Sequence, residues 1–236
     1  MEFFTPHLLP YFDIKIYDKW GNKTEGIQSL WATPGNMQET SACDYVMLGY
    51  PAKYISELVQ DISQYVKKDT VVFDICSVKT PAVQAMIEYL PSDCHIVATH
   101  PIFWPQSGKN GIEWLKCTLS QVRVPDEKYD FLKHIFWEKM WLKIFELTPE
   151  EHDKQMAYVQ GITHFIGRSL KKMNIPNAEL ATCSYSDLYT SSETVGYDSD
   201  ELFLSIQTDN PYVWEVRKTL MQELETQNTW IENNKD

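Results

Sequence analysis

Two short segments contain the residue types that acid–base chemistry needs. Ser77 and Lys79 lie in the stretch DICSVK, and His100 lies in THPIF further along the chain. Histidine suits proton transfer because its unperturbed pKa of about 6.5 lies near working pH, and a nearby serine could hold the same substrate hydroxyl. The alternative is that Ser77 caps a turn and that His100 is an ordinary loop histidine. Position alone does not decide between the two.

Cys76 adjoins Ser77 and offers a thiol nucleophile, but a buried structural cysteine is the more ordinary interpretation. The five cysteines are odd in number, scattered, and form no CxxC pair. This spacing argues against a zinc site and against a disulfide framework. We therefore expect no bound metal and a reducing cytoplasmic location.

The residues that would position these groups alternate between strand and helix patterns. Strands are predicted at 13–17, 44–48, 70–75, 95–99, 120–124 and 142–147, and helices at 3–12, 51–66, 80–90 and 127–140. This alternation implies right-handed crossovers and a doubly wound, mostly parallel α/β sheet of the Rossmann type. Ligands bind at the carboxyl ends of the strands in such sheets. Ser77, Lys79 and His100 are therefore expected to converge there.

The composition changes at Thr148, and from there to the end the pattern is helical. We predict an α/β domain over residues 1–147 and an all-helical domain over 148–236. In the first helix, expected over 149–173, a polar stripe lies opposite an apolar face. The stripe is Asp153, Gln160, His164 and Lys171; the apolar face is Val159, Ile162, Phe165, Ile166, Leu170 and Met173. The stripe is either a solvated surface or the second wall of a cleft between the domains.

Charge and hydropathy exclude several partners. The formal net charge of -12 offers no footprint for nucleic-acid phosphates, and it does not favour an anionic membrane surface. An anionic substrate would need locally placed cations. We also expect neither a membrane span nor a signal peptide, because no apolar run is long enough.

Three stretches together resemble the prephenate and arogenate dehydrogenases of tyrosine biosynthesis. They are DICSVKTP, ATHPIFWPQSGKNG and TPEEHDKQMAYVQGITHFIGRSL, and a weaker match is SDLYTSSETVGYDSDELFLSIQTDNPY. In this order they cover most of the chain after about residue 40. The combination is specific, although each piece alone is weak. The SGKNG segment looks especially like the arogenate-type members.

The resemblance implies an NAD(P)-dependent oxidative decarboxylation of a cyclohexadienyl carboxylate. Hydride leaves ring C4 for the nicotinamide, CO2 leaves C1, and the ring becomes aromatic. His100 would accept a hydrogen bond or proton from the 4-hydroxyl, and Ser77 would help to hold that hydroxyl. His164 and Gln160 match the helical-domain motif and would line the substrate side. Members of the family dimerise through the helical domain, so the resemblance also implies a homodimer.

The chain departs from dinucleotide enzymes of this fold because it contains no GxG sequence. The first, central strand and its phosphate-binding loop are therefore missing, and we expect that the natural start lies upstream or that the sequence is truncated. For the cofactor we expect contacts from Asp18, Pro51 and Lys79. Asp18 stands where an acid would bind the ribose, which favours NAD over NADP, while Lys19 and Lys23 count in the other direction.

A second departure concerns the ring carboxylate. No arginine occurs between Arg168 and Arg217, so Arg168 and Lys171 are the cations that helical position offers. Prephenate, arogenate and a related compound all stay open as the substrate. Three functions stay open: an active dehydrogenase, a non-catalytic relative that binds the substrate, and another reductase on the same two-domain plan.

Overall fold

The structure is a computed structural model that describes residues 3–19, 31–103 and 107–235. The chain divides into two compact units, Met1–Pro149 and Glu150–Asp236, and each is described by itself. The domain boundary predicted from the sequence, between residues 147 and 148, falls close to this division. Within the described residues, no helix combines the length and the apolar character that crossing a bilayer requires.

Unit 1 is built on a five-stranded sheet with the order β3-β4-β5-β6-β7. The strands are β3 (Tyr45–Leu48), β4 (Val71–Asp74), β5 (His95–Pro101), β6 (Lys116–Arg123) and β7 (Lys143–Glu146). β3, β4 and β5 run parallel, β6 runs antiparallel to β5, and β7 is parallel to β6. The mostly parallel α/β fold predicted from the sequence is confirmed.

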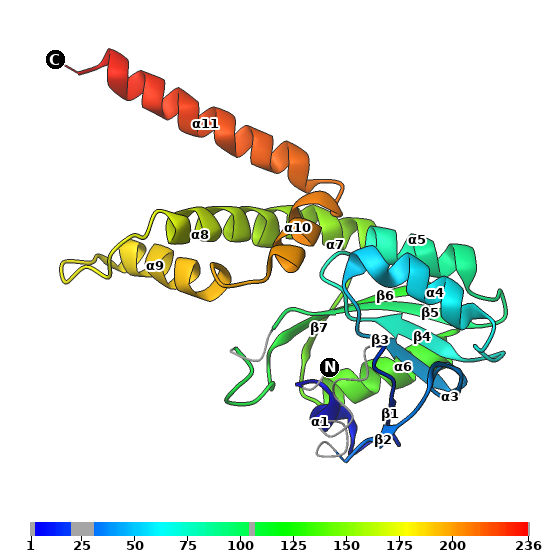
Figure 1. Cartoon of the computed structure of the whole chain (residues 1–236). Helices are drawn as coiled ribbons and strands as arrows, with labels where there is room; N and C mark the ends of the chain where they lie inside the picture. The colour runs from blue at the N-terminus through cyan, green and yellow to red at the C-terminus, as the bar shows by residue number, and fades with distance from the viewer. Residues whose placement is uncertain (1–2, 20–30, 104–106, 236) are drawn as a thin grey trace. The chain divides into compact units, whose positions relative to one another are not determined.

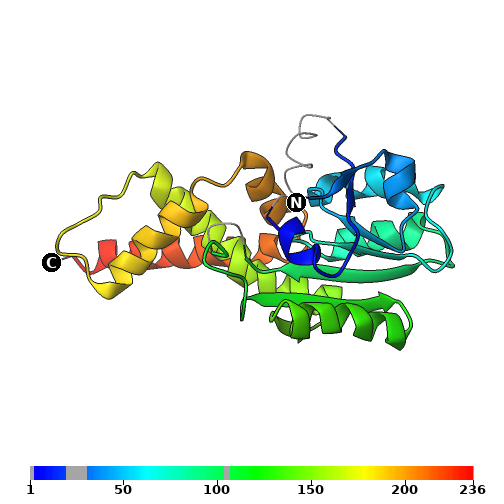
Figure 2. The same cartoon turned by 90° about the horizontal axis from the view of Figure 1, so that it is seen from below.

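Helices cover both faces of this sheet (Figures 1 and 2). The short 3₁₀ turn η1 (Ala52–Tyr54) leads into α4 (Ile55–Ser63), which packs with α5 (Thr80–Tyr89) on one face. α6 (Asp126–His134) and the π-helical turn η2 (Ile135–Lys139) lie on the other. Side chains alternate along a strand, so Val72 packs into the α4–α5 core and its neighbours Val71 and Phe73 pack into the α6 core. β4 is buried at every position, as expected for a strand covered on both faces.

β6 differs from its sequence prediction. It begins at Lys116 rather than near Ser120, and it returns antiparallel to β5. Antiparallel neighbours need no crossover helix, and the described part of 102–115 contains none. The regular alternation of strand and helix therefore breaks at this point.

The N-terminal segment forms a separate small sheet. β1 (Lys15–Ile16) pairs in parallel with β2 (Thr33–Pro34), and β3 is an edge of the larger sheet. Among the described strands, none joins β1 to β3. Within the described residues the two sheets are therefore separate. The predicted helix at 3–12 is only the short α1 (Thr5–Leu8).

One further helix, α3 (Met37–Ser41), lies between the strands predicted at 13–17 and 44–48, where the sequence pattern predicted neither a helix nor a strand. It begins with a capping box, in which the Asn36 side chain accepts from the Glu39 amide at 2.9 Å and the Glu39 carboxylate accepts from the Asn36 amide at 3.1 Å. The spacing Asn-x-x-Glu is a signal for a helix start. The polar, glycine-containing composition of the segment suggested no helix, so the signal was not used.

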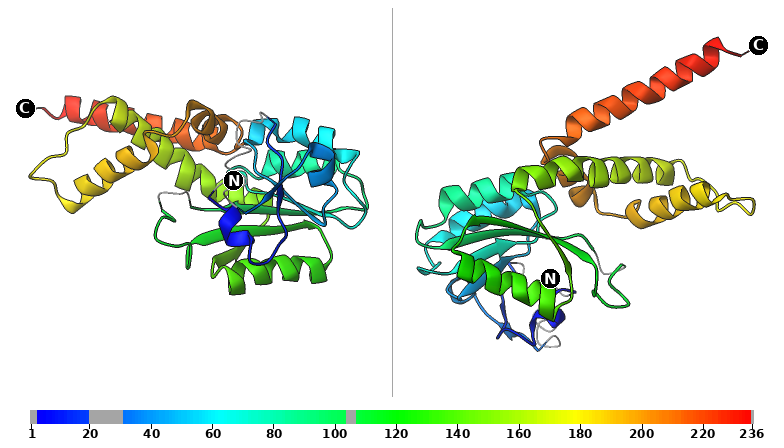
Figure 3. Two further views of the ribbon diagram at one scale, coloured as in Figure 1. Left: turned by 60° about the horizontal axis from the view of Figure 1, so that its bottom comes forward. Right: turned by 180° about the vertical axis from the view of Figure 1, so that it is seen from behind.

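Unit 2 is entirely helical in its described part, as predicted. α7 (Pro149–Met156), the π-helical turn η3 (Ala157–Ile162) and α8 (Thr163–Lys172) follow one another without a break. They are succeeded by α9 (Cys183–Val195), α10 (Asp200–Thr208) and α11 (Val213–Asn233). α8 and α9 lie side by side (Figure 3). Their approach depends on Gly167, where an added Cβ would lie 2.3 Å from Cγ2 of Val195.

Candidate active site

Ser77 and His100 lie toward the carboxyl ends of neighbouring parallel strands. β4 ends at Asp74 and the following loop carries Ser77, while β5 carries His100 next to its last residue. Both side chains are buried, with 8% and 1% of their surface exposed. The structure therefore brings the two predicted catalytic residues to the same edge of the sheet, where ligands bind in folds of this class.

His100 is a strand residue, which corrects its predicted place just after the strand. It pairs with Thr118 of β6, and Pro101 pairs with Cys117. These rungs carry β5 past Thr99, where we predicted that it ends. The description of His100 as an ordinary loop histidine is therefore wrong, since both sequence neighbours and the facing strand fix its backbone.

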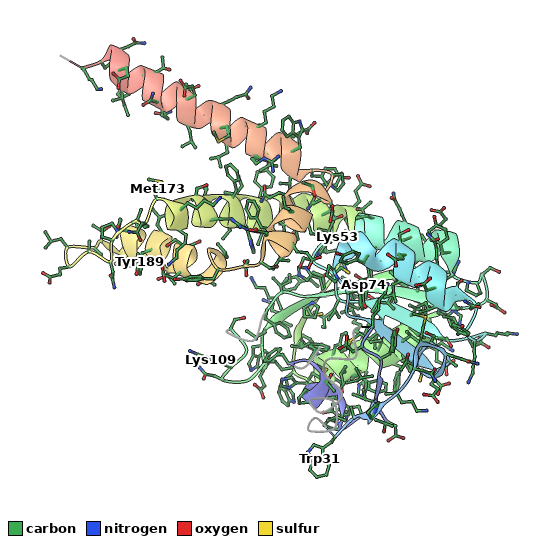
Figure 4. The ribbon with its side chains drawn as sticks, in the orientation of Figure 1. Trp31, Lys53, Asp74, Lys109, Met173 and Tyr189 are labelled. Atoms are coloured by element: carbon green, nitrogen blue, oxygen red, sulfur yellow. The ribbon has the colours of Figure 1, made fainter. Side chains whose placement is uncertain are left out.

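A buried ion pair closes the loop that carries Ser77. Lys79 Nζ donates to Asp74 Oδ2 and, at 2.6 Å, to the carbonyl oxygen of Thr99. The Lys79 and Asp74 side chains are both 0% exposed. Figure 4 labels Asp74, which is the last residue of β4. The Cys76 amide donates to the same Asp74 oxygen at 3.0 Å, so both ends of the loop are tied to one carboxylate.

The thiols near this site are poor nucleophiles. Burial raises the pKa of Cys76 well above its ordinary value, and burial raises the pKa of Cys117 to about 12. A thiol must ionise before it attacks. The geometry therefore supports the interpretation of Cys76 as a structural residue.

The residues predicted for the cofactor lie in different surroundings. Asp18 is half-buried just after β1, Pro51 is exposed just before η1, and Lys79 is enclosed in the ion pair with Asp74. Lys19 Nζ is 2.9 Å from Oε1 of Glu57, so the Glu57 carboxylate partly neutralises the charge of Lys19. Lys23 lies outside the described residues.

A dinucleotide also needs backbone amides at its pyrophosphate, which a glycine loop between a strand and a helix provides. The sequence holds no GxG, and the described strands include none that joins the β1–β2 sheet to β3. The described residues thus offer Asp18 as the residue that would meet the ribose, and no glycine loop for the pyrophosphate. Among those residues, no cluster of three or more His, Cys, Asp or Glu is arranged to hold a metal ion.

In unit 2, the polar stripe predicted on the long helix is interrupted by a π-helical turn. Gln160 lies inside η3 and His164 lies in the first turn of α8. Their side chains are buried, at 8% and 7% exposed, whereas Val159 on the predicted apolar face is 53% exposed. The interpretation of the stripe as a solvated surface is therefore wrong for Asp153, Gln160 and His164, which are buried before, within and after the π turn.

Acidic side chains lie close to three of the predicted substrate-binding residues. Asp198 Oδ2 lies 3.0 Å from His164 Nδ1, and Glu193 Oε1 lies 2.6 Å from Lys171 Nζ. Arg168 donates to Asp200, and its guanidinium lies 4.4 Å from the centre of the Phe203 ring. One nitrogen of Arg168, Nη1, is buried without a hydrogen-bond partner among the described residues.

Sequence reasoning missed two sets of residues. Asp74 was read only as the end of a strand, although its spacing of five residues from Lys79 allowed the pairing. The acids between 193 and 200 were recognised as a family-like stretch but were not paired with the cations of α8. The π turn left no sequence signal that we recognise.

Family models match both units of the chain. The nucleotide-binding domain of prephenate dehydrogenase matches residues 18–119, and the dimerization domain of prephenate dehydrogenase matches residues 148–236. The chain is 33% identical over 153 residues to arogenate dehydrogenase 2 of Arabidopsis thaliana, covering 63% of this chain and 42% of the relative. It is 31% identical over 121 residues to the NADP(+) prephenate dehydrogenase of Saccharomyces cerevisiae, covering 51% of this chain and 26% of the relative. The chain thus spans about half or less of the length of the curated relatives that it matches.

Solved structures share the fold at low identity. Prephenate dehydrogenase from Aquifex aeolicus, in complex with hydroxyphenyl propionate and NAD+, superposes with a TM-score of 0.76 at 18% identity, over 98% of this chain and 87% of that one. Synechocystis arogenate dehydrogenase gives 0.71 at 18% identity, over 98% and 88%. With both family models matched in order, the chain belongs to the prephenate and arogenate dehydrogenase family.

Proposed function

We propose that this protein carries out the NAD(P)-dependent oxidative decarboxylation of prephenate or arogenate in tyrosine biosynthesis. The observation that supports it most is the placement of His100, fixed in β5 next to the loop of Ser77, in a chain of this family. In this reaction a hydride passes from ring C4 to an oxidised nicotinamide while C1 loses CO2. The chain's own residues would hold the 4-hydroxyl and accept its proton.

His100 would take the 4-hydroxyl proton as the C4 carbonyl forms. Its ring is almost fully covered, with 1% of the residue exposed, so bulk water would compete little for that proton once the substrate is bound. Ser77 would hold the hydroxyl oxygen toward His100. Neither role needs a metal ion, because the developing charge is relieved by proton transfer to the imidazole.

Unit 2 would supply the substrate side. We assign His164 and Gln160 to the ring and its side chain, and Arg168 and Lys171 to the carboxylate. Arg168 is the better supported of the two cations, since its buried Nη1 has no partner in the described part of the chain. A carboxylate oxygen would satisfy that nitrogen. Lys171 is already bound to Glu193.

The test is an assay of the full chain with each substrate and each cofactor. The proposal expects reduced nicotinamide and CO2 in equal amounts from one of the four combinations. His100→Ala should lower turnover about 10²–10⁴-fold, the usual effect of a lost acid–base group. Unchanged turnover in that variant would remove His100 from its role.

A second candidate function is that of a relative that binds the substrate and leaves it unchanged. The observation behind it is that the given sequence contains no GxG to supply phosphate-binding amides. Calorimetric binding of prephenate or arogenate without any reduction of either cofactor would favour this candidate. Cofactor reduction would exclude it.

The choice of cofactor and location is part of the proposal. Asp18 after β1 favours NAD, because an acid at this position accepts from a ribose hydroxyl and repels a 2′-phosphate. The yeast relative is named as an NADP(+) enzyme. We keep the cytoplasm as the proposed location, since all five cysteines are free thiols and the cell interior keeps thiols reduced. The matched Arabidopsis proteins are named as chloroplastic.

We also propose a homodimer formed through unit 2. The matched family domain is a dimerization domain, and α11 leaves large apolar side chains exposed: Trp214, Met221, Leu224 and Ile231 are 50–61% exposed. At about 100° per residue these four lie within roughly one third of the helix surface. A second copy would bury that face.

Light scattering on gel-filtered protein tests the dimer. Leu224→Glu places a charge in the apolar face and should give a monomer at micromolar concentration. Thr226→Glu places the same charge on the other side of α11 and should leave the dimer intact. A wild-type monomer, or a Leu224→Glu dimer as stable as wild type, would contradict the proposal.

A further inference from the structure

The buried ion pair between Asp74 and Lys79 lies between the two residues assigned to proton transfer. Asp74 ends β4, and the loop from Asp74 to Lys79 contains Ser77. Lys79 in turn contacts the carbonyl of Thr99, the residue directly before His100. One lysine therefore touches both the segment of Ser77 and the segment of His100.

The Thr99 contact has a clear place in the sheet. The β4–β5 ladder ends with the rung between Asp74 and Ala98, so Thr99 has no β4 residue opposite it. Neighbouring residues of a strand direct their backbone groups to opposite sides. His100 pairs with Thr118 on the β6 side, and the Thr99 carbonyl accordingly points to the β4 side, where Lys79 Nζ lies 2.6 Å away. The lysine ammonium takes the position of the next rung.

A second bond fixes the same point. The Thr99 hydroxyl donates to the backbone carbonyl of Asp74, so Thr99 is held through both its carbonyl and its side chain. All three residues are fully buried. Because hydrogen bonds to charged groups are stronger in surroundings without water, the end of β5 is held more firmly than an ordinary strand end.

Burial of this charge pair is not explained by stability alone. Replacing a buried ion pair by apolar side chains is often neutral or stabilising, and the strand ends could be closed by ordinary backbone rungs. What the pair adds is a rigid link between two loops whose side chains must meet the same substrate hydroxyl. A misplacement of about 1 Å can lower a rate about 10²-fold. A rigid link that keeps Ser77 and His100 in place would therefore preserve the rate.

We propose that Asp74 and Lys79 are positioning residues, which hold the backbone of His100 in register with the loop of Ser77 through the Thr99 carbonyl. The catalytic benefit of this link rests on the proposed function, whereas the claim that the ion pair holds the His100 backbone does not. It also gives Lys79 a different task from cofactor binding, to which the sequence pattern assigned it. The two tasks predict different kinetics.

The first experiment needs no activity. The chain has six histidines, and the ring signals of His100 in a ¹H–¹³C spectrum can be assigned by their loss in His100→Asn. Lys79→Met removes the charge, and the double variant Asp74→Asn with Lys79→Met keeps the protein folded if the single change does not. We expect the His100 ring signals to shift or broaden in every folded variant of this pair. Unchanged His100 signals in the folded double variant would overturn the proposal.

Lys128→Met is the matched control. Lys128 also donates from its ammonium to a backbone carbonyl, that of Asp69, which precedes β4 at the other end of the strand. The control loses the same kind of bond in the same sheet, so it should leave the His100 signals in place. A shift as large as that of the double variant would show that any loss of a lysine–carbonyl bond disturbs the sheet, and would also overturn the proposal.

The second experiment is kinetic and separates the proposals. In the double variant kcat should fall about 10²-fold, with the KM values of substrate and cofactor unchanged. A raised cofactor KM with unchanged kcat would instead make Lys79 a cofactor ligand and refute the positioning role. If wild type shows no turnover, or if His100→Asn retains it, the proposed function fails, and the spectra of His100 still decide whether Asp74 and Lys79 position it.

Discussion

Removing the charge of Lys79 alone should destabilise unit 1 severely. Lys79 and Asp74 are both 0% exposed, so Lys79→Met leaves a buried carboxylate without its counter-ion, at a cost of about 3–5 kcal/mol. The Thr99 carbonyl also loses its donor, which adds about 1 kcal/mol. Because a domain is stable by only about 5–15 kcal/mol, this single change would bring unit 1 close to unfolding.

The double variant should recover most of that loss. Asp74→Asn with Lys79→Met leaves no charge in the interior, and the side-chain oxygen of the new asparagine can still accept from the Cys76 amide that Asp74 binds at 3.0 Å. We expect a cost of about 1–3 kcal/mol. Hydrogen exchange of peptides from β4 and β5 measures the stability of unit 1 directly, and the four variants of the cycle give the coupling energy.

An exposed ion pair in the same unit provides the control. Lys133 Nζ lies 2.5 Å from Glu146, with the side chains 36% and 49% exposed, so Lys133→Met should cost less than about 1 kcal/mol. The hydrogen bond from Lys133 lowers the pKa of Glu146, and this small contribution should disappear as pH falls through the folded-state pKa. If Lys79→Met costs no more than Lys133→Met, or if the two changes in the buried pair are additive, the reasoning is refuted.

Two further predictions concern packing and thiol chemistry. Gly167→Ala should lower the melting temperature of unit 2, because its Cβ would lie 2.3 Å from Val195. The crowding costs about 1–3 kcal/mol, which exceeds the gain of about 1 kcal/mol in helix propensity. Adding Val195→Ala should restore the melting temperature, and an unchanged melting temperature in Gly167→Ala would contradict the close contact between α8 and α9. In the native protein a thiol reagent should modify the exposed Cys183 and spare the buried Cys76 and Cys117 until denaturant is added, and fast labelling of either buried thiol would contradict their enclosure.

Much of unit 1 could be predicted because its signals are local. Thr80-Pro81 is typical of a helix start, and α5 does begin at Thr80. The run from Val71 to Asp74 has the apolar character of a strand covered on both faces. The direction of β6 could not be read, because strand periodicity is the same for parallel and antiparallel neighbours.

The candidate site was only partly predictable. The sequence placed Ser77 and His100 on neighbouring strands, since strand ends fix such positions. It could not show that Lys79 turns inward, because the partner that attracts it, the Thr99 carbonyl, is a backbone group of another strand. On the long helix, helical spacing grouped the polar stripe but could not show that Asp153, Gln160 and His164 are buried, because burial depends on the helices packed against it.

The most direct test of the central claim is the release of CO2 and reduced nicotinamide by wild type and by His100→Asn. The account predicts equal amounts of both products from prephenate or arogenate with wild type, and a fall in kcat/KM of about 10²–10⁴-fold in the variant. Formation of both products at the same rate by His100→Asn, or none by wild type, would contradict it.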